Sequence, residues 1–168
     1  AFDAVVSNFV VPHLSRPERA VSELVRVLRG GGRLALTTWD QPDRMRFLGV
    51  FLDAFAEAGA APLPDIPAGP AFFQFADDET FAYLLTGCGL SGVEVTTVAF
   101  DHRIQSGEEL WQGMLGGMVR TSATFLGQSQ QTREKIRTAF DRLVLDYRRG
   151  ESFEVPVSVK LASAVKPS

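Results

Sequence analysis

The sequence predicts an α/β fold with four strands, and three observations lead to this prediction. The chain opens with an apolar run over residues 1–7, an amphipathic helical pattern and a second apolar run over residues 33–39. A strand, a helix and a strand in this order favour a right-handed βαβ unit with a parallel pair. Helical patterns dominate the middle, and from residue 153 to 165 apolar residues alternate with others, which is the period of a strand.

The first helix is expected between the two opening strands. Ser15 and Glu18 have the spacing of a capping box, and Pro17 falls in the first turn. Apolar residues then recur at helical spacing. The three glycines at 30–32 end the helix in this interpretation, because glycine adopts the left-handed C-cap conformation without steric cost.

Four further helices and one long strand follow from the periodicity of the remaining chain. The helices are expected over residues 44–58, 77–87, 107–118 and 130–147. The strand is expected over residues 93–104, with a bulge near Thr96. Residues 59–70 are rich in proline and have no periodicity, so they are expected to form a loop.

Composition excludes several classes of protein. The net charge is −3 with no basic block, so the chain lacks the electrostatic footprint of a nucleic-acid-binding protein. No apolar run approaches the ~20 residues of a membrane-spanning helix. A single cysteine excludes an internal disulfide, and two histidines distant in sequence do not indicate a metal site. We therefore expect no metal, no nucleic-acid partner, no membrane and a cytoplasmic location.

Two segments carry a resemblance to a known family. FDAVVSNFVVPHL at residues 2–14 and ELVRVLRGGGRL at residues 23–34 resemble the class I S-adenosylmethionine-dependent methyltransferases. The family pattern begins with FD-x-V-x-(S/N) and has a histidine a few residues later. It continues with E-h-x-R-V-L-x-P-G-G-x-L, where h is an apolar residue. In this sequence Gly30 stands where the second motif has proline. The segment GCGLSGVEV at residues 87–95 is similar to the family's entry into a C-terminal antiparallel hairpin.

The resemblance implies a partial Rossmann-like methyltransferase sheet, in which a parallel strand pair joined by a helix is followed by a C-terminal antiparallel hairpin with inserted helices. We interpret residues 1–168 as a single domain that resembles the C-terminal half of a methyltransferase domain. Residues 1–42 form its strand–helix–strand core, residues 43–92 hold helices and a lid-like loop, and residues 93–168 form the hairpin with its inserted helices.

The family's cofactor signature has no counterpart in this sequence. It consists of a glycine-rich turn after the first strand and an acidic residue that ends the second strand. We expect residue 1 to be a boundary within a longer protein, at the family's fourth strand. Because an unpaired apolar strand edge is a template for pairing, we also expect an upstream segment or a second chain, as in a dimer, to cover residues 1–7.

The resemblance implies that the residues after the first strand line the methionine end of S-adenosylmethionine, once the missing N-terminal half is supplied. In such sheets ligands lie outside the carboxyl ends of the strands, where this chain has Ser7, Asn8, Phe9 and Val10. A structural role for Asn8 in the strand turn is the alternative. His13 is the candidate catalytic acid or base, because imidazole exchanges a proton near neutral pH, and a structural role is its alternative.

Aromatic and thioether side chains are expected to contact the substrate, and such surfaces suit an apolar or aromatic small molecule. The candidates are Trp39 at the end of the second strand, Phe72, Phe73 and Phe75 after the proline-rich loop, and Trp111 and Met114 on a later helix. Ordinary core packing is the alternative for these residues.

Two functions follow from these features. The first is a truncated or partial S-adenosylmethionine-dependent methyltransferase that acts on a small apolar or aromatic molecule. The alternative is a non-catalytic, methyltransferase-like binding or interaction module. A hydrolase is disfavoured, because the sequence has no serine in a G-x-S-x-G turn and no signature of a cysteine–histidine pair.

Overall fold

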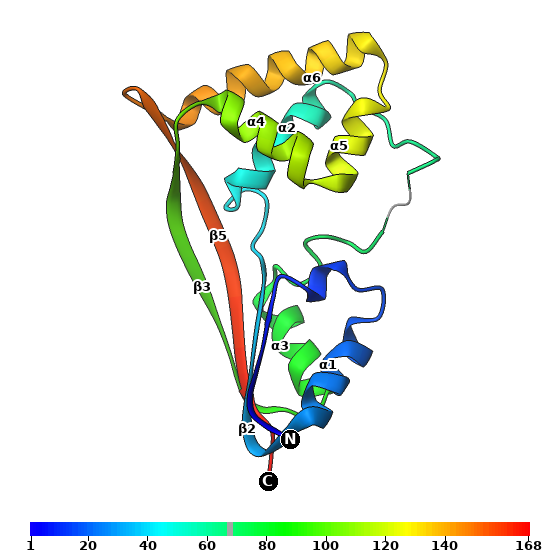
Figure 1. Cartoon of the computed structure of the whole chain (residues 1–168), viewed down its shortest axis with the longest axis vertical. Helices are drawn as coiled ribbons and strands as arrows, with labels where there is room; N and C mark the ends of the chain where they lie inside the picture. Colours follow the sequence, from blue (N-terminus) through cyan, green and yellow to red (C-terminus); the bar gives the residue numbers. More distant parts are fainter. Residues whose placement is uncertain (67–68) are drawn as a thin grey trace. The chain divides into compact units, whose positions relative to one another are not determined.

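A computed structural model of the chain describes residues 1–66 and 69–168, and its strands form a mixed sheet in the order β1-β2-β5-β3 (Figure 1). The strands are β1 (Phe2–Asn8), β2 (Leu28–Trp39), β3 (Ser91–Ile104), the two-residue β4 (Arg148–Arg149) and β5 (Ser152–Val165). β1 pairs with β2 in parallel, and β2 and β4 each pair with β5 antiparallel. The predicted α/β fold with an opening parallel pair is confirmed.

The helices agree with the periodicity, with one addition. They are α1 (Pro17–Val27), α2 (Arg46–Glu57), α3 (Asp78–Gly87), α4 (Gly107–Gly117), α5 (Val119–Leu126) and α6 (Gln130–Leu143), with 3-10 turns η1 (Val11–His13) and η2 (Val144–Tyr147). The short helix α5 is absent from the sequence prediction. Two residues of the predicted loop, 67 and 68, lie outside the described residues.

The predicted capping box at the start of α1 is wrong. The helix begins at Pro17, and its N-cap is Arg16, whose side chain makes no capping hydrogen bond. Proline fixes the backbone of the first helical residue and has no N–H that needs an acceptor. The chain therefore enters the helix at Pro17, without a side-chain cap from Ser15.

The three glycines do not end α1 either; they lie in β2. The register of β2 against β1 jumps from Phe2↔Leu28 to Ala4↔Arg33, so the glycines form a bulge opposite Asp3. Gly31 has a φ of 75°. A Cβ atom on Gly32 would stand 3.2 Å from the carbonyl oxygen of Asp3. The bulge thus requires glycine for a left-handed residue and for a close approach of two backbones.

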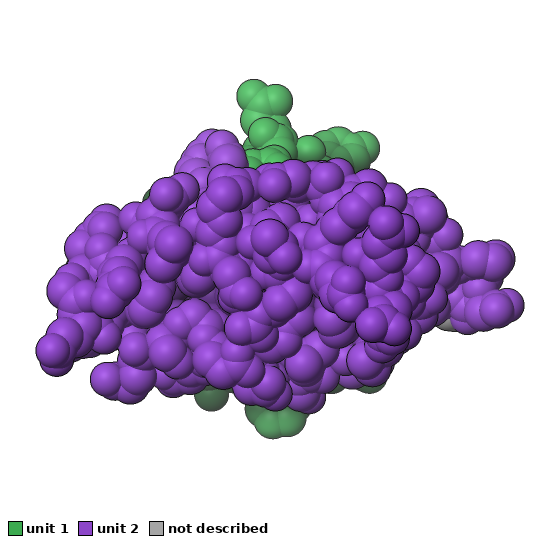
Figure 2. Space-filling model, turned by 90° about the horizontal axis from the view of Figure 1, so that it is seen from above, with its two compact units in different colours: residues 1–41, 69–99, 158–168 green, residues 42–68, 100–157 purple. Residues whose placement is uncertain are grey.

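Contacts divide the chain into two compact units, which Figure 2 colours separately. Unit 1 comprises residues 1–41, 69–99 and 158–168, and unit 2 comprises residues 42–68 and 100–157. The strands β3 and β5 contribute residues to both units. The interpretation of residues 1–168 as a single domain stays a prediction.

In unit 1, α1 and α3 pack on one face of the sheet. Val21 from α1, Phe81 and Leu85 from α3, and Leu34 and Leu36 from β2 are at most 1% exposed in this core. β1 is the terminal strand of the sheet, and its Phe2 and Val6 are 59% and 73% exposed.

In unit 2, helices surround a second core. Phe51 from α2 stacks on Phe140 from α6, with ring centroids 4.8 Å apart. Trp111 from α4 packs against both rings, and Val155 of β5 is buried in the same cluster.

Candidate functional site

The candidate site lies where β1 and β2 end side by side in unit 1. Asn8, the last residue of β1, is the register partner of Thr37 in β2. The Thr37 hydroxyl donates a hydrogen bond to Asn8 Oδ1 and accepts one from the backbone N–H of Phe9, with an N···O distance of 3.1 Å. Parallel strands that end together place such side chains at one edge of the sheet, which is where α/β sheets bind ligands.

Phe9 has a left-handed backbone. Its φ is 54°, the only positive value for a residue other than glycine in the described part of the chain. For a bulky L-residue this conformation costs about 1–2 kcal/mol. Strain of this kind persists where surrounding contacts hold the residue in place, and functional sites are a common location. Here the Thr37 hydroxyl and the Trp39 ring hold Phe9.

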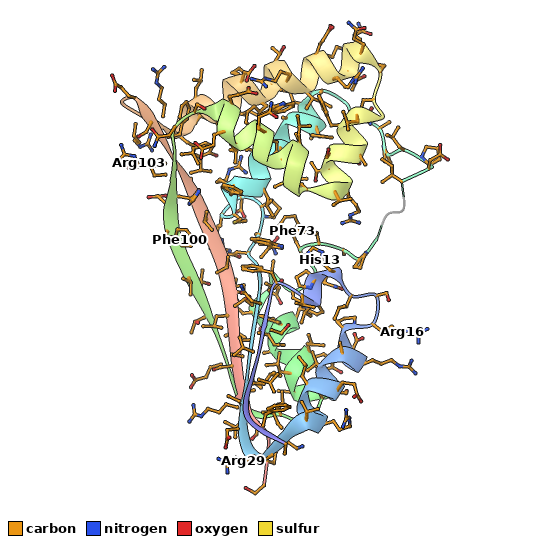
Figure 3. The ribbon with its side chains drawn as sticks, in the orientation of Figure 1. His13, Arg16, Arg29, Phe73, Phe100 and Arg103 are labelled. Carbon is orange, nitrogen blue, oxygen red and sulfur yellow. The ribbon has the colours of Figure 1, made fainter. Side chains whose placement is uncertain are left out.

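Five rings gather at this edge, and we call them the aromatic cluster: Phe9, His13, Trp39, Phe72 and Phe73. Trp39 stacks on Phe9 with centroids 4.1 Å apart and on Phe72 at 6.0 Å. The edges of His13 and Phe73 meet Phe72, each at 5.4 Å (Figure 3 labels both). The structure therefore brings together residues that are separate in sequence, all within unit 1.

The indole of Trp39 carries an unused hydrogen-bond donor. Its Nε1 atom is buried, and it has no hydrogen-bond partner among the described residues. A buried donor without an acceptor costs about 1–3 kcal/mol, so an acceptor atom that enters the cluster gains from meeting it. The cluster thus combines apolar ring faces with a donor.

A buried charged group lies directly after the site. The Asp40 side chain is fully buried; it accepts hydrogen bonds from the Ser158 hydroxyl at 2.7 Å and from the backbone N–H of Gln41 at 2.8 Å. The Lys160 ammonium, also buried, lies 3.7 Å from Asp40, 2.7 Å from Asp78 and 2.8 Å from the Thr97 hydroxyl. Buried ions need such partners, and these connect the end of β2 to β5 and α3.

The start of α3 adds a capping carboxylate near this group. Asp77 accepts a hydrogen bond from the backbone N–H of Thr80 at 2.9 Å. This bond, reinforced by the Thr80 hydroxyl, holds the pKa of the Asp77 carboxyl below its ordinary value of 3.8.

The other predicted site residues make no ring contact with the aromatic cluster among the contacts described. Ser7 is half-buried within β1 and Val10 is 48% exposed. Phe75 is 6% exposed in the core of unit 1. Trp111 and Met114 belong to the core of unit 2, where they are 4% and 1% exposed. Their roles as substrate contacts stay predictions, and their burial supports core packing.

Sequence reasoning missed three residues of the site: Thr37, Asp40 and Lys160. A signal for the first two existed, because polar residues at the carboxyl end of an apolar strand mark a ligand-binding edge. Lys160 gave a misleading signal. The apolar residues of the β5 pattern are odd-numbered, and the pattern predicts that they are buried. In the part of β5 that belongs to unit 1, the buried residues are instead even-numbered: Ser158, Lys160, Ala162 and Ala164.

Other surfaces of the described residues offer less. An open depression of about 540 Å³ on unit 2 is lined by Phe125, Gln130, Arg133, Glu134, Arg137 and Thr138, none of them a predicted site residue. Within residues 1–66 and 69–168, no three histidine, cysteine or acidic side chains are grouped as a metal would require. None of the helices described has the length and apolar character to cross a bilayer.

Among proteins of known structure, the chain is similar to phosphoethanolamine N-methyltransferase 2 of Haemonchus contortus (16% identity, TM-score 0.46); the match covers 99% of this chain and 34% of that one. It is also similar to a putative methyltransferase of Bacillus halodurans (17% identity, TM-score 0.48), covering 99% of this chain and 70% of that one. The chain thus spans about a third of the nematode enzyme's length.

Sequence comparisons give one family and no individual relative. No curated protein sequence matches the chain significantly. Residues 1–36 match the family described as "Methyltransferase domain". This segment contains β1, α1 and most of β2, including the strand end at Asn8 and Phe9. Over residues 1–36, the resemblance to a methyltransferase that the sequence predicts is therefore confirmed by the match to this family.

Proposed function

We propose that this chain is part of an S-adenosylmethionine-dependent methyltransferase that acts on a small apolar or aromatic molecule. One observation carries the proposal: in the segment that matches the methyltransferase family, the first strand is followed directly by the strained Phe9, which stacks on Trp39. Rigid aromatic faces at the carboxyl ends of parallel strands suit a flat apolar ligand.

The donors of the site fit a cofactor that carries acceptor oxygens. Trp39 Nε1 is buried without an acceptor among the described residues, and the Asn8 side chain is exposed at the strand end. In the proposal Ser7, Asn8, Phe9 and Val10 hold the cofactor. When bound, S-adenosylmethionine supplies an electrophilic methyl group on a sulfonium.

The remaining rings of the cluster orient the acceptor molecule in this proposal. Methyl transfer is an in-line displacement, so positioning supplies much of the rate. Trp39, Phe72 and Phe73 offer ring faces and edges to an apolar substrate. His13 is exposed at the end of η1 beside Phe72, where its imidazole can take a proton from a substrate.

A covering partner for β1 belongs to the same proposal. β1 is the terminal strand of the sheet, and the exposure of Phe2 and Val6 supports a cover made by an upstream segment or a second chain. In this proposal the upstream segment or the second copy of the chain completes the cofactor site, and the protein is cytoplasmic.

Calorimetric titration of the 168-residue chain with S-adenosylhomocysteine tests the proposal. We expect saturable micromolar binding that Trp39→Ala weakens and Trp111→Phe leaves unchanged, because Trp111 lies in the core of unit 2. Absence of binding up to millimolar ligand contradicts a cofactor site in this chain.

The second candidate is a non-catalytic methyltransferase-like binding module. It is favoured by the lack of the glycine-rich cofactor turn in the sequence. This alternative predicts that an apolar aromatic molecule binds at the aromatic cluster and changes the fluorescence of Trp39. It also predicts that S-adenosylhomocysteine does not bind.

A further inference from the structure

A single hydroxyl group connects the two strand ends of the candidate site. Thr37 Oγ1 lies between the backbone nitrogen of Phe9, at 3.1 Å, and Asn8 Oδ1. A hydroxyl has one hydrogen to donate. The arrangement is thus a directed chain: the Phe9 N–H donates to Thr37, and Thr37 donates to Asn8.

The direction of this chain orients the Asn8 amide. Because the Thr37 hydrogen requires an acceptor, the Asn8 oxygen faces Thr37 and its Nδ2 group faces away. Asn8 is exposed, and its Nδ2 group makes no hydrogen bond to any of the described residues. Asn8 therefore presents two N–H donors at the carboxyl end of β1.

The same hydroxyl supports the strained residue of the site. Phe9 lies in the left-handed region, and its backbone N–H would lose its acceptor without Thr37. The Phe9 ring contacts Trp39, two residues beyond Thr37 on β2. Thr37 thus influences a donor on one side and an aromatic face on the other.

We propose that Thr37 is the positioning residue of this site: its hydroxyl fixes Asn8 as a hydrogen-bond donor toward an acceptor oxygen of a ligand and holds Phe9 in its left-handed conformation. The proposal rests on the proposed function only for the choice of ligand probe. It assigns the role to the hydroxyl and not to the methyl group of the threonine.

Two substitutions separate these groups. Thr37→Val keeps the shape and removes the hydroxyl, and Thr37→Ser keeps the hydroxyl and removes the methyl group. Thr38→Val is the control, because Thr38 Oγ1 is buried without a hydrogen-bond partner among the described residues. Thermal unfolding of each variant establishes that it is folded.

Amide hydrogen exchange, followed by nuclear magnetic resonance, tests the proposal without a ligand. We expect Thr37→Val to raise the exchange rate of the Phe9 amide roughly tenfold and to shift the Asn8 side-chain amide signals. Thr37→Ser and Thr38→Val should leave both close to those of the wild type. Equal exchange rates in the wild type and Thr37→Val overturn the proposal.

Ligand binding tests the orientation of Asn8. The probes are S-adenosylhomocysteine, which carries a carboxylate, and 5′-methylthioadenosine, which lacks it. We expect Asn8→Asp to weaken only the first probe, roughly tenfold, Thr37→Val to weaken the first probe more than the second, and Thr37→Ser to bind both as the wild type does. Asn8→Asp keeps the acceptor for Thr37, so Phe9 exchange should not change.

The two failures are distinguishable. If the wild-type chain binds neither probe, the proposed function fails, and the exchange of the Phe9 amide alone decides the role of Thr37. If both probes weaken equally in Thr37→Val while Phe9 exchange is unchanged, the orientation of Asn8 by Thr37 is refuted.

Discussion

Lys160 shows how one buried residue holds the end of β2 to its neighbours. Its ammonium contacts Asp40, Asp78 and Thr97, which come from three different parts of unit 1. A buried ion pair seldom adds stability compared with apolar residues of equal volume. Its loss is costly for another reason, because the remaining partner stays charged in the core.

We expect Lys160→Met to lower the free energy of unfolding by about 3 kcal/mol, because it removes a buried ammonium that lies 3.7 Å from the fully buried Asp40 and 2.7 Å from Asp78. Urea denaturation at neutral pH measures this change. Asp78→Asn is the matched control: Asp78 is 57% exposed, so a change of about 1 kcal/mol or less is expected. Equal losses in the two variants would contradict the assignment of the buried partner.

The sequence predicts the members of the aromatic cluster but not their arrangement. Phe9, Trp39 and Phe72 stand out as aromatic residues next to a strand end or a loop, whereas their stacking depends on the left-handed backbone of Phe9. Nothing local predicts that conformation, because it is maintained by Thr37 from a strand 28 residues away.

At the scale of elements, the start of α3 is stabilised by an N-cap residue, Asp77, whose carboxyl group can take up a proton. The Asp77 carboxylate accepts from the Thr80 N–H, and its pKa is lowered by this bond. A carboxyl group with a lowered pKa in the folded state stabilises above its unfolded pKa, near 3.8, and loses this contribution as the pH falls through the folded value.

We therefore expect the wild type to be more stable than Asp77→Ala at pH 6, with the difference shrinking as the pH falls below about 4. Circular dichroism during urea unfolding at several pH values measures it. Asp77→Ser keeps a capping oxygen that does not titrate in this range, so its advantage over Asp77→Ala should be independent of pH. A difference between wild type and Asp77→Ala that stays constant down to pH 2 would refute the role of the charge.

Strand and helix positions followed from periodicity, but their ends did not. The glycines at 30–32 read as a helix end because glycine favours both C-caps and bulges, and only the register with β1 distinguishes the two. The burial of Lys160 could not be predicted from the local sequence either, since its partners Asp40 and Asp78 are distant in sequence. Long-range pairings of this kind decide what a local pattern leaves open.

For the whole molecule, the exposed edge of β1 has the largest consequence. The exposed Phe2 and Val6 give this strand an apolar border at the end of the sheet. Natural proteins protect such edges with charges, bulges or a covering segment, because unprotected edges pair with other chains.

We expect the average mass of the chain in solution to rise with concentration, and Val6→Lys to reduce this rise, because a charge at the edge opposes pairing. Light scattering over a concentration series measures it. Val119→Lys is the matched control: Val119 is 83% exposed on α5 of unit 2, and its substitution should leave association unchanged. Indistinguishable behaviour of the two variants would exclude β1 as the contact.

The position of β5 between β2 and β3 also sets the order of events during synthesis. Unit 1 gathers residues 1–41, 69–99 and 158–168, so β2 acquires its second neighbour only when residues 159–165 leave the ribosome. Until then Leu34 and Leu36 lack the strand that borders them in the finished sheet. Since chain segments so far apart must meet, unit 1 completes its fold only after residues 159–165 have left the ribosome, and the apolar residues of β2 stay without this neighbour until then.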